Sequence, residues 1–232
     1  MKIDQEDHDA TNAYQSLSET TEHDDPRWAF GSGMLGDIGC HLMDVAFWAL
    51  DLQHPTRVEA LDGAPLDEEV TAEWIIAAYD FPGRGADAPP VKLTWYDAPK
   101  QPPMISSWNL PPKLAGEGVV FVGEGGKLLF TNYDQHLLLP AEQFKDYQRP
   151  PQSIPPSPGH QAEWVNACLK SDPAATSTPF TYGALLTEAA LLGTVAFRAR
   201  KPLEWDAAAM RIKNAPDAEK LLDYEHLAGW TL

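Results

Sequence analysis

The sequence predicts an α+β fold, in which helices pack on one face of an open, mainly antiparallel sheet. The first observation is the order of elements: a helix-like segment precedes a group of strand-like segments, and further helix-like segments follow, without the alternation of a doubly wound parallel sheet. The second is the turn Glu124-Gly125-Gly126 between two apolar runs, which is typical of an antiparallel hairpin. The third is a hydrophobic content of 44% with 8 Trp, 8 Phe and 7 Tyr, which is enough for a folded core.

The elements can be assigned in order along the chain. Residues 1–26 are polar and acidic without periodicity, so we expect a mobile arm or lead-in segment, followed by one domain over residues 27–232. A helix is expected at about 36–50, and strands are expected at 57–63, 70–81, 91–97, 118–123, 127–132 and 136–140. Helices at 160–170 and 182–200 follow, and Asn214 is the expected N-cap of a last helix at 214–224.

Charge and composition exclude several classes of partner. Lys plus Arg total 17 against 34 Asp plus Glu, and a net charge of −17 repels the phosphates of nucleic acids and anionic membranes. We see no uninterrupted apolar run of about 18 residues and no signal-like N-terminus, so we expect a cytoplasmic protein. Cys40 and Cys168 are too few for a disulfide framework, and we expect both to be reduced and buried.

The segment "GSGMLGDIGCHLMD", residues 31–44, contains the Gly31-x-Gly33-x-x-Gly36 spacing of a dinucleotide-binding loop. Such a loop requires a buried strand before it and a helix after it, so that the backbone can approach the pyrophosphate. A helix is expected to follow, but the preceding "EHDDPRWAF" contains charges and a proline instead of an apolar run. Asp37 would also meet the phosphate's negative charge. We therefore expect these glycines to form a flexible helix entry with no cofactor site.

The helix after these glycines is expected to have two distinct faces. At about 100° per residue, Asp37, His41, Asp44 and Trp48 fall within about 60° of one another. A separate apolar stripe lies about 120° round the helix, and it consists of Ile38, Leu42, Val45, Ala46 and Ala49. Asp37 and His41 are one turn apart, and a carboxylate beside an imidazole raises the imidazole pKa and fixes its tautomer, as proton transfer near neutral pH requires.

Two other interpretations of this face remain open from the residues alone. Asp37 is a common residue type at a helix cap or in a first turn, and His41 is then a half-buried histidine with a structural role. A metal site from Asp37, His41 and Asp44, with His160 or His136, has suitable ligand types but no recognised ligand spacing. We do not expect a metal.

Several motifs together resemble a known family. "GSGMLGDIGCHLMDVAFWAL" resembles the G-G/T-G-x-L-x-D-x-G-x-H-x-x-D segment of the Gfo/Idh/MocA oxidoreductases, the glucose–fructose oxidoreductase and inositol dehydrogenase family. "PGHQAEWVNACLKSDPAATSTPFTYGALLTEAALLGTVAFRARKPLEWD" and "KNAPDAEKLLDYEHLAGW" are similar to the end of its large bacterial branch, so the resemblance covers residues 27–232. It implies a C-terminal α+β domain that binds substrate and forms oligomer contacts, in proteins whose N-terminal Rossmann domain binds NAD(P).

The resemblance also implies roles for individual residues. Asp37 and His41 match the family's catalytic pair: His41 would exchange a proton with a sugar or polyol hydroxyl while hydride moves to or from the nicotinamide, and Asp37 would orient the site. Asp44, on the same helix face, and His160 are expected to contact substrate. The family's E-K-P lysine motif is absent from this sequence. The expectation is therefore a substrate half without its cofactor half, with NAD or NADP bound only in a full-length parent.

Aromatic side chains are candidates for stacking on the apolar face of a sugar. Trp108 is favoured because it follows a proline-rich loop, and four weaker candidates are Trp28, Trp95, Tyr96 and Tyr182. Trp74 is expected in the core, and Glu163 is expected on a solvated face.

Four functional hypotheses remain. The first is a stand-alone substrate domain that binds a carbohydrate-like ligand, self-associates through its open sheet and does not transfer hydride alone. In the second, a separate Rossmann polypeptide completes the site in trans. The third is a cofactor-independent lyase, epimerase or hydrolase that uses Asp37 and His41 as an acid/base pair. The fourth is a non-catalytic oligomerisation scaffold.

Overall fold

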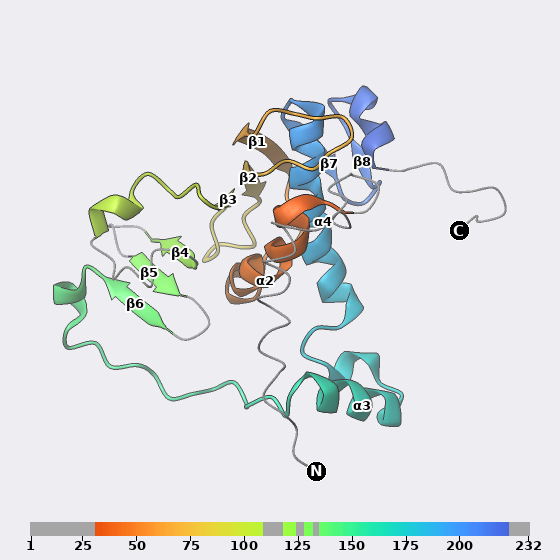
Figure 1. Cartoon of the computed structure of the whole chain (residues 1–232). Coiled ribbons are helices and arrows are strands. Elements are labelled where there is room, and N and C mark those ends of the chain that lie inside the picture. The colour runs from red at the N-terminus through yellow and green to blue at the C-terminus, as the bar shows by residue number, and fades with distance from the viewer. Residues whose placement is uncertain (1–30, 109–117, 124–127, 132–134, 223–232) are drawn as a thin grey trace, which may run out of the picture.

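The structure, a computed structural model, describes residues 31–108, 118–123, 128–131 and 135–222, so the arm expected at 1–26 lies outside the described residues. Its fold is α+β, with antiparallel strands and with helices packed on one face of the larger sheet, as predicted (Figure 1).

The larger sheet positions the helices. Within the described residues it has five strands in the order β3-β2-β1-β7-β8, and every neighbouring pair is antiparallel. The bounds are β1 Arg57–Gly63, β2 Ile75–Phe81, β3 Val91–Tyr96, β7 Leu203–Asp206 and β8 Arg211–Ile212. Ile75, Ala77, Tyr79 and Phe81 alternate along β2 and are all buried, as expected for one face of a pleated strand.

Three of the predicted strands form a separate sheet instead of extending the first one. The strands β4 Val119–Val122, β5 Leu128–Thr131 and β6 His136–Leu139 pair in that order, also antiparallel. The proline-rich stretch 98–112 separates them from β3 in the chain, and proline removes the N–H that a sheet ladder requires. The expected turn Glu124-Gly125-Gly126 lies outside the described residues.

Two long helices, α2 (Gly33–Leu50) and α4 (Phe180–Ala199), cover the buried face of this five-stranded sheet. α4 packs against α2, β1 and β2, and Gly193 of α4 lies directly against the Tyr79 hydroxyl and the Leu35 side chain. The ring of Phe47 in α2 meets that of Phe81 in β2 edge to face, with 5.4 Å between centroids. Both helices therefore share one core with the sheet.

The buried face of α2 differs from the predicted apolar stripe. The buried residues are Leu35, Gly39, Met43, Ala46 and Phe47, whereas Val45 and Ala49 of the predicted stripe are exposed. At 100° per residue the observed face is displaced by about 90° from the predicted one. The reason is α4: Gly39 lies against Ala190, so small residues at the crossing let the two helices approach closely.

α4 is the one described helix that is long and apolar enough, by length and composition alone, to cross a membrane. Its buried residues include Leu186, Ala189, Leu192, Ala196 and Phe197, which belong to the hydrophobic core. The fold itself thus accounts for the apolar composition of this helix.

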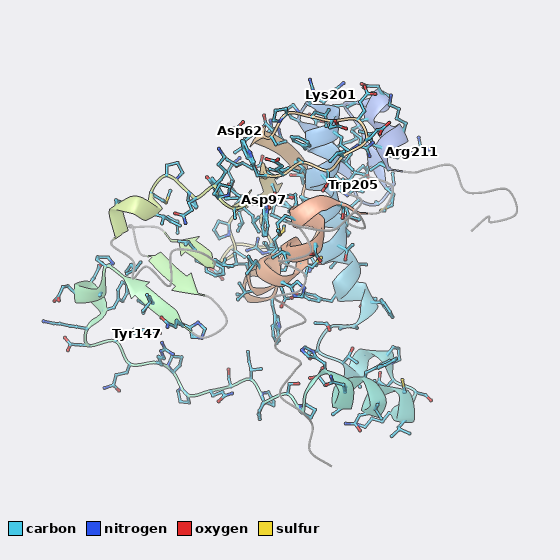
Figure 2. All side chains as sticks on the ribbon, viewed as in Figure 1. Asp62, Asp97, Tyr147, Lys201, Trp205 and Arg211 are labelled. Atoms are coloured by element: carbon cyan, nitrogen blue, oxygen red, sulfur yellow. The ribbon has the colours of Figure 1, made fainter. Side chains whose placement is uncertain are left out.

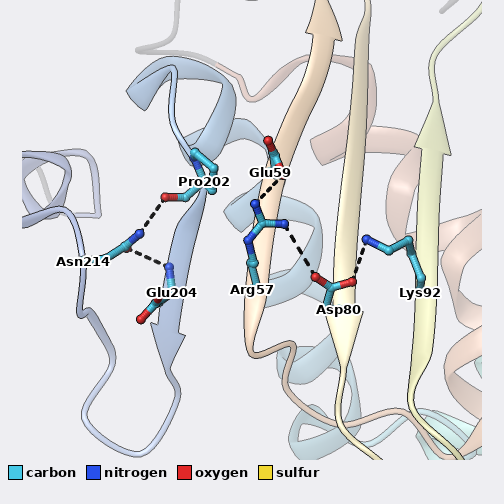
Figure 3. Close-up of polar contacts among 7 residues, drawn as sticks. All are labelled: Arg57, Glu59, Asp80, Lys92, Pro202, Glu204 and Asn214. Atoms are coloured by element: carbon cyan, nitrogen blue, oxygen red, sulfur yellow. Dashed lines mark hydrogen bonds and ion pairs between the residues drawn. The ribbon is translucent and has the colours of Figure 1, made fainter.

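The C-terminal part differs from prediction in two ways. The expected helix at 214–224 is a 3-10 helix over Pro216–Leu221, preceded by Ala215 as N-cap. The Asn214 side chain does not cap it: its Oδ1 accepts from the Glu204 N–H at 2.8 Å, and its amide donates to the Pro202 carbonyl at 2.9 Å (Figure 3). Asn214 therefore braces β7, one of two short strands that the sequence did not predict.

Three further expectations about burial were wrong. Cys40 is half-buried and Cys168 is exposed, so neither is a core residue. Trp74 is also half-buried, and the Lys100 ammonium lies over its ring at 3.9 Å from the centroid.

Candidate functional site

The candidate acid/base pair lies on the exposed side of α2. Asp37 and His41 are both exposed, whereas Leu35, Gly39 and Met43 on the opposite side are buried. The helix begins at Gly33 with Ser32 as N-cap, so Asp37 lies in the second turn. The structural interpretations, a capping or first-turn role for Asp37 and a half-buried histidine, are therefore wrong. The two side chains form no hydrogen bond with each other in this conformation.

Asp44, one turn further along α2, is hydrogen-bonded to a residue that lies far away in the sequence. The Tyr182 hydroxyl, at the start of α4, donates to the Asp44 carboxylate at 2.5 Å and lies 3.3 Å from the Asp44 carbonyl. Burial, together with the hydrogen bond to Asp44, raises the pKa of Tyr182. Tyr182 was a candidate for sugar stacking, but its hydroxyl instead fixes the position of the Asp44 side chain. No local sequence signal joins two residues 138 positions apart.

The structure does not bring His160 to this group. His160 is the exposed first residue of α3 (His160–Lys170), a helix that packs against the 3-10 helix Pro173–Ala175. Its described electrostatic interaction is with Glu163 of the same helix. Trp108 ends the 3-10 helix Ile105–Trp108, and its side chain lies outside what the structure describes. Over the described ranges, no cluster of three or more His, Cys, Asp or Glu residues could hold a metal ion.

Trp95, another stacking candidate, is instead part of a buried polar cluster. Its indole N–H donates to one oxygen of Asp97 at 2.6 Å, and the backbone N–H of Ile75 donates to the other at 2.8 Å. Asp97 is only 2% exposed. Burial raises the pKa of its carboxyl, and the two hydrogen bonds oppose this shift. Trp95 and Asp97 thus join the ends of β2 and β3, and neither is available to a ligand.

The described residues do not fit a dinucleotide. A dinucleotide fold requires parallel strands joined by a crossover helix, whereas every strand pair in the described part of the chain is antiparallel. Gly36 has a local packing role, because a Cβ at this position would overlap the Ser32 side chain. The glycine spacing therefore serves the entry to α2.

The two hollows described here lie elsewhere. A trough of about 1420 Å³ runs along α4, and a smaller hollow of about 390 Å³ is lined by residues 53–56 and 205–207 together with Pro82 and Lys213. His54 and Trp205 line both hollows. The Trp205 indole N–H donates to Glu188 Oε1 of α4 at 2.9 Å. His54 Nδ1 lies 2.7 Å from the same oxygen and donates to it when the imidazole carries its proton on Nδ1. Figure 2 shows Trp205 and Arg211 beside α4. Neither hollow is lined by Asp37, His41 or Asp44, and no motif in the sequence predicted either one.

Neither the family models nor the curated proteins gave a match to this chain. The chain is similar to a crystal structure described as an oxidoreductase from Agrobacterium radiobacter in complex with NAD+, L-tartaric acid and magnesium, with 14% identity and a TM-score of 0.37. The similarity covers 75% of this chain and 49% of that one, so this chain spans about half the length of that protein. At this identity and TM-score, the ligands of that structure are not assigned to this chain.

Proposed function

We propose that this chain is the substrate-binding and self-association part of an NAD(P)-dependent sugar or polyol oxidoreductase that acts in the cytoplasm. The observation that carries the proposal is the exposed pair Asp37 and His41 in the second turn and third turn of α2, on the side of the helix that faces away from the core. The resemblance of residues 31–50 to the Gfo/Idh/MocA segment supports the same assignment.

In this proposal each residue on α2 has a distinct role. His41 takes a proton from, or returns it to, a substrate hydroxyl, because an imidazole exchanges protons near neutral pH. Asp37 lies one turn away and orients the imidazole once substrate draws the two side chains together. Asp44, already held by Tyr182, offers its second oxygen to another hydroxyl of the substrate. Trp108 and His160 remain proposed substrate contacts.

The charge of the chain favours a neutral substrate. A net charge of −17 repels anions over the whole surface, so sugar phosphates and sugar acids approach poorly. A neutral polyol has no such barrier, and its hydroxyls are hydrogen-bond partners for carboxylate and imidazole groups. Because the described residues do not fit a dinucleotide, we assign the nicotinamide to polypeptide outside them, either in a longer parent chain or in a separate Rossmann partner.

Self-association is assigned to the outer face of the sheet. There Arg57, Asp80 and Lys92 lie directly opposite one another on β1, β2 and β3 (Figure 3). Lys92 pairs with Asp80 at 2.8 Å, and Arg57 contacts Asp80 at 3.7 Å and Glu59 at 2.6 Å. Charges of both signs on one flat surface are suited to pairing with the same surface of a second copy.

The test is ligand binding followed at single histidines. In 1H–13C spectra of the full chain, a panel of neutral sugars and polyols should shift the His41 ring signals, and the His41→Ala and Asp37→Asn variants should weaken binding at least tenfold. His54 is the internal control, because Glu188 holds its ring beside the α4 trough. If no panel member shifts His41, or if His54 shifts equally, the proposal is wrong. Calorimetric titration with NAD and NADP should show no micromolar binding, and such binding would contradict the assignment of the nicotinamide to other polypeptide.

A further inference from the structure

The helix α3 exposes its apolar side to solvent. Trp164 is 69% exposed, Val165 is 52% exposed and Leu169 is 80% exposed, and the Cys168 thiol lies among them. At 100° per residue these four side chains cover one continuous side of the helix, which we name the α3 stripe. Ala167 is the one buried residue of α3. An amphipathic helix normally turns its apolar side to the core, so this orientation requires a cause.

The cause is a polar anchor on the opposite side of α3. The Glu163 carboxylate accepts from the Ser157 hydroxyl at 2.5 Å, from the Ser177 N–H at 3.0 Å and from the Ser177 hydroxyl. The hydrogen bonds from both serines lower the pKa of Glu163 to about 2. These bonds tie the segments before and after α3 to its polar side, so the α3 stripe is held outward. Glu163 is therefore an anchor, and not merely part of a solvated face.

We propose that the α3 stripe is an interface between two copies of this chain, in which two α3 helices pack antiparallel about a twofold axis. The stripe is self-complementary in this arrangement. A twofold axis midway between Val165 and Cys168 places Val165 of one copy against Cys168 of the other. The same axis places Trp164 of one copy against Leu169 of the other. The two smaller pairs then lie together at the axis, and a pair of large side chains lies on each side of them.

The area and charge of the stripe also suit a second copy. Covering these exposed side chains removes on the order of 500 Å² from each copy, so the total of about 1,000 Å² reaches the lower limit for a specific interface. The stripe contains no charged side chain, although the chain as a whole carries −17. A membrane surface is a poorer occupant, because membrane-surface helices have a polar side rich in Lys and Arg, and α3 has only Lys170 beside the acidic Glu163.

This interface lies apart from the outer face of the sheet, and it does not depend on the proposed function. Its size predicts a weak dimer, and sedimentation equilibrium of the full chain should show a micromolar dissociation constant. Trp164→Ala and Leu169→Glu should each raise that constant about thirtyfold, the effect expected of a hot spot at the centre of an interface. Trp48→Ala removes another exposed Trp, 59% exposed, from α2 and should leave the dissociation constant unchanged.

A cross-linking experiment locates the contact directly. In a Cys40→Ser variant, Cys168 is the remaining cysteine, and a short bismaleimide should link two copies. The Cys168→Ser variant, which keeps Cys40, should not be linked. Circular dichroism must show that the Trp164 and Leu169 variants keep the native helix content, as expected for exposed positions. A chain that remains monomeric at high concentration would overturn the proposal. So would association whose dissociation constant neither stripe substitution changes.

Discussion

Replacing the buried Asp97 by alanine tests how the ends of β2 and β3 are held. The carboxylate is the acceptor for two buried donors, the Ile75 N–H at 2.8 Å and the Trp95 indole N–H at 2.6 Å. Alanine fits the space but accepts nothing, so both donors lose their partner. A buried donor without a partner costs about 1–3 kcal/mol.

The expected loss is smaller than the sum for two donors. Burial disfavours the ionised carboxylate, as its raised pKa shows, and the substitution removes that unfavourable burial. We therefore expect Asp97→Ala to lower the free energy of unfolding by about 2–4 kcal/mol. For a chain of this length each kcal/mol corresponds to roughly 2–4 °C, so the melting temperature should fall by about 4–16 °C.

Urea unfolding followed by tryptophan fluorescence and far-ultraviolet dichroism measures this loss. The matched control is Asp80→Ala, which removes a carboxylate from the same sheet. Asp80 is half-exposed and pairs with Lys92 and Arg57, so its loss should cost less than about 1 kcal/mol. If Asp97→Ala costs no more than Asp80→Ala, the two hydrogen bonds do not contribute as argued.

The same carboxyl makes a prediction about pH. Because burial raises its pKa, the folded protein keeps the Asp97 proton to a higher pH than the unfolded chain does. Its contribution to stability is therefore complete below the unfolded pKa of roughly 3.9 and declines as pH rises through the folded pKa. The difference in unfolding free energy between wild type and Asp97→Asn should accordingly shrink over this window. A difference that grows with pH would show that hydrogen bonding outweighs burial.

Three further predictions concern the helices. Tyr182→Phe removes the hydroxyl that donates to the Asp44 carboxylate. It should lower the free energy of unfolding in urea by about 1 kcal/mol while the fold is retained, and no measurable loss would mean that water replaces the hydroxyl. Gly193→Ala adds a Cβ that would overlap a buried tyrosine hydroxyl and should cost about 1–3 kcal/mol, whereas Gly183→Ala, in open space on the same helix, should stabilise by up to about 1 kcal/mol. Glu163 should titrate in carboxyl carbon spectra at about pH 2. Its contribution to the free energy of unfolding is therefore present above the unfolded pKa and is lost as pH falls through 2. Ser177→Ala should raise the titration midpoint of Glu163, and an unchanged midpoint would exclude the hydrogen bonds from Ser177 as the cause of the low pKa.

The sequence predicted the polar side of α2 better than its buried side. Asp37 and His41 were expected on one face of the helix, apart from the apolar stripe, and the structure leaves both exposed. The apolar stripe was misplaced because apolar side chains such as Val45 were taken to mark the core. The helix instead buries Leu35, Gly39 and Met43, and the missing side chain of Gly39 lets Ala190 of α4 approach. Which small residues lie at a crossing depends on a partner helix about 150 residues away in the chain.

Polar contacts over long sequence distances were the main source of error elsewhere. Asn214 has the residue type of a helix cap, but its amide completes the hydrogen bonds of β7 instead. Glu163 looked like a solvated carboxylate, and the serines that it binds lie in irregular segments with no periodicity to predict their position. Residue type and spacing indicate what a polar side chain can bind, whereas the fold determines which partner reaches it.

The buried face of α2 also limits where other molecules can approach. Leu35, Gly39 and Met43 face the core, so Asp37 and His41 point away from the sheet. In the proposed function, the substrate and the nicotinamide therefore both approach from the helical side of the molecule. The outer face of the sheet, with Asp80 and its cations, lies on the opposite side of the core, where we propose self-association. Lys92→Glu should therefore change assembly without changing the ligand-induced shift of His41, and a change in both would show that the two faces are coupled.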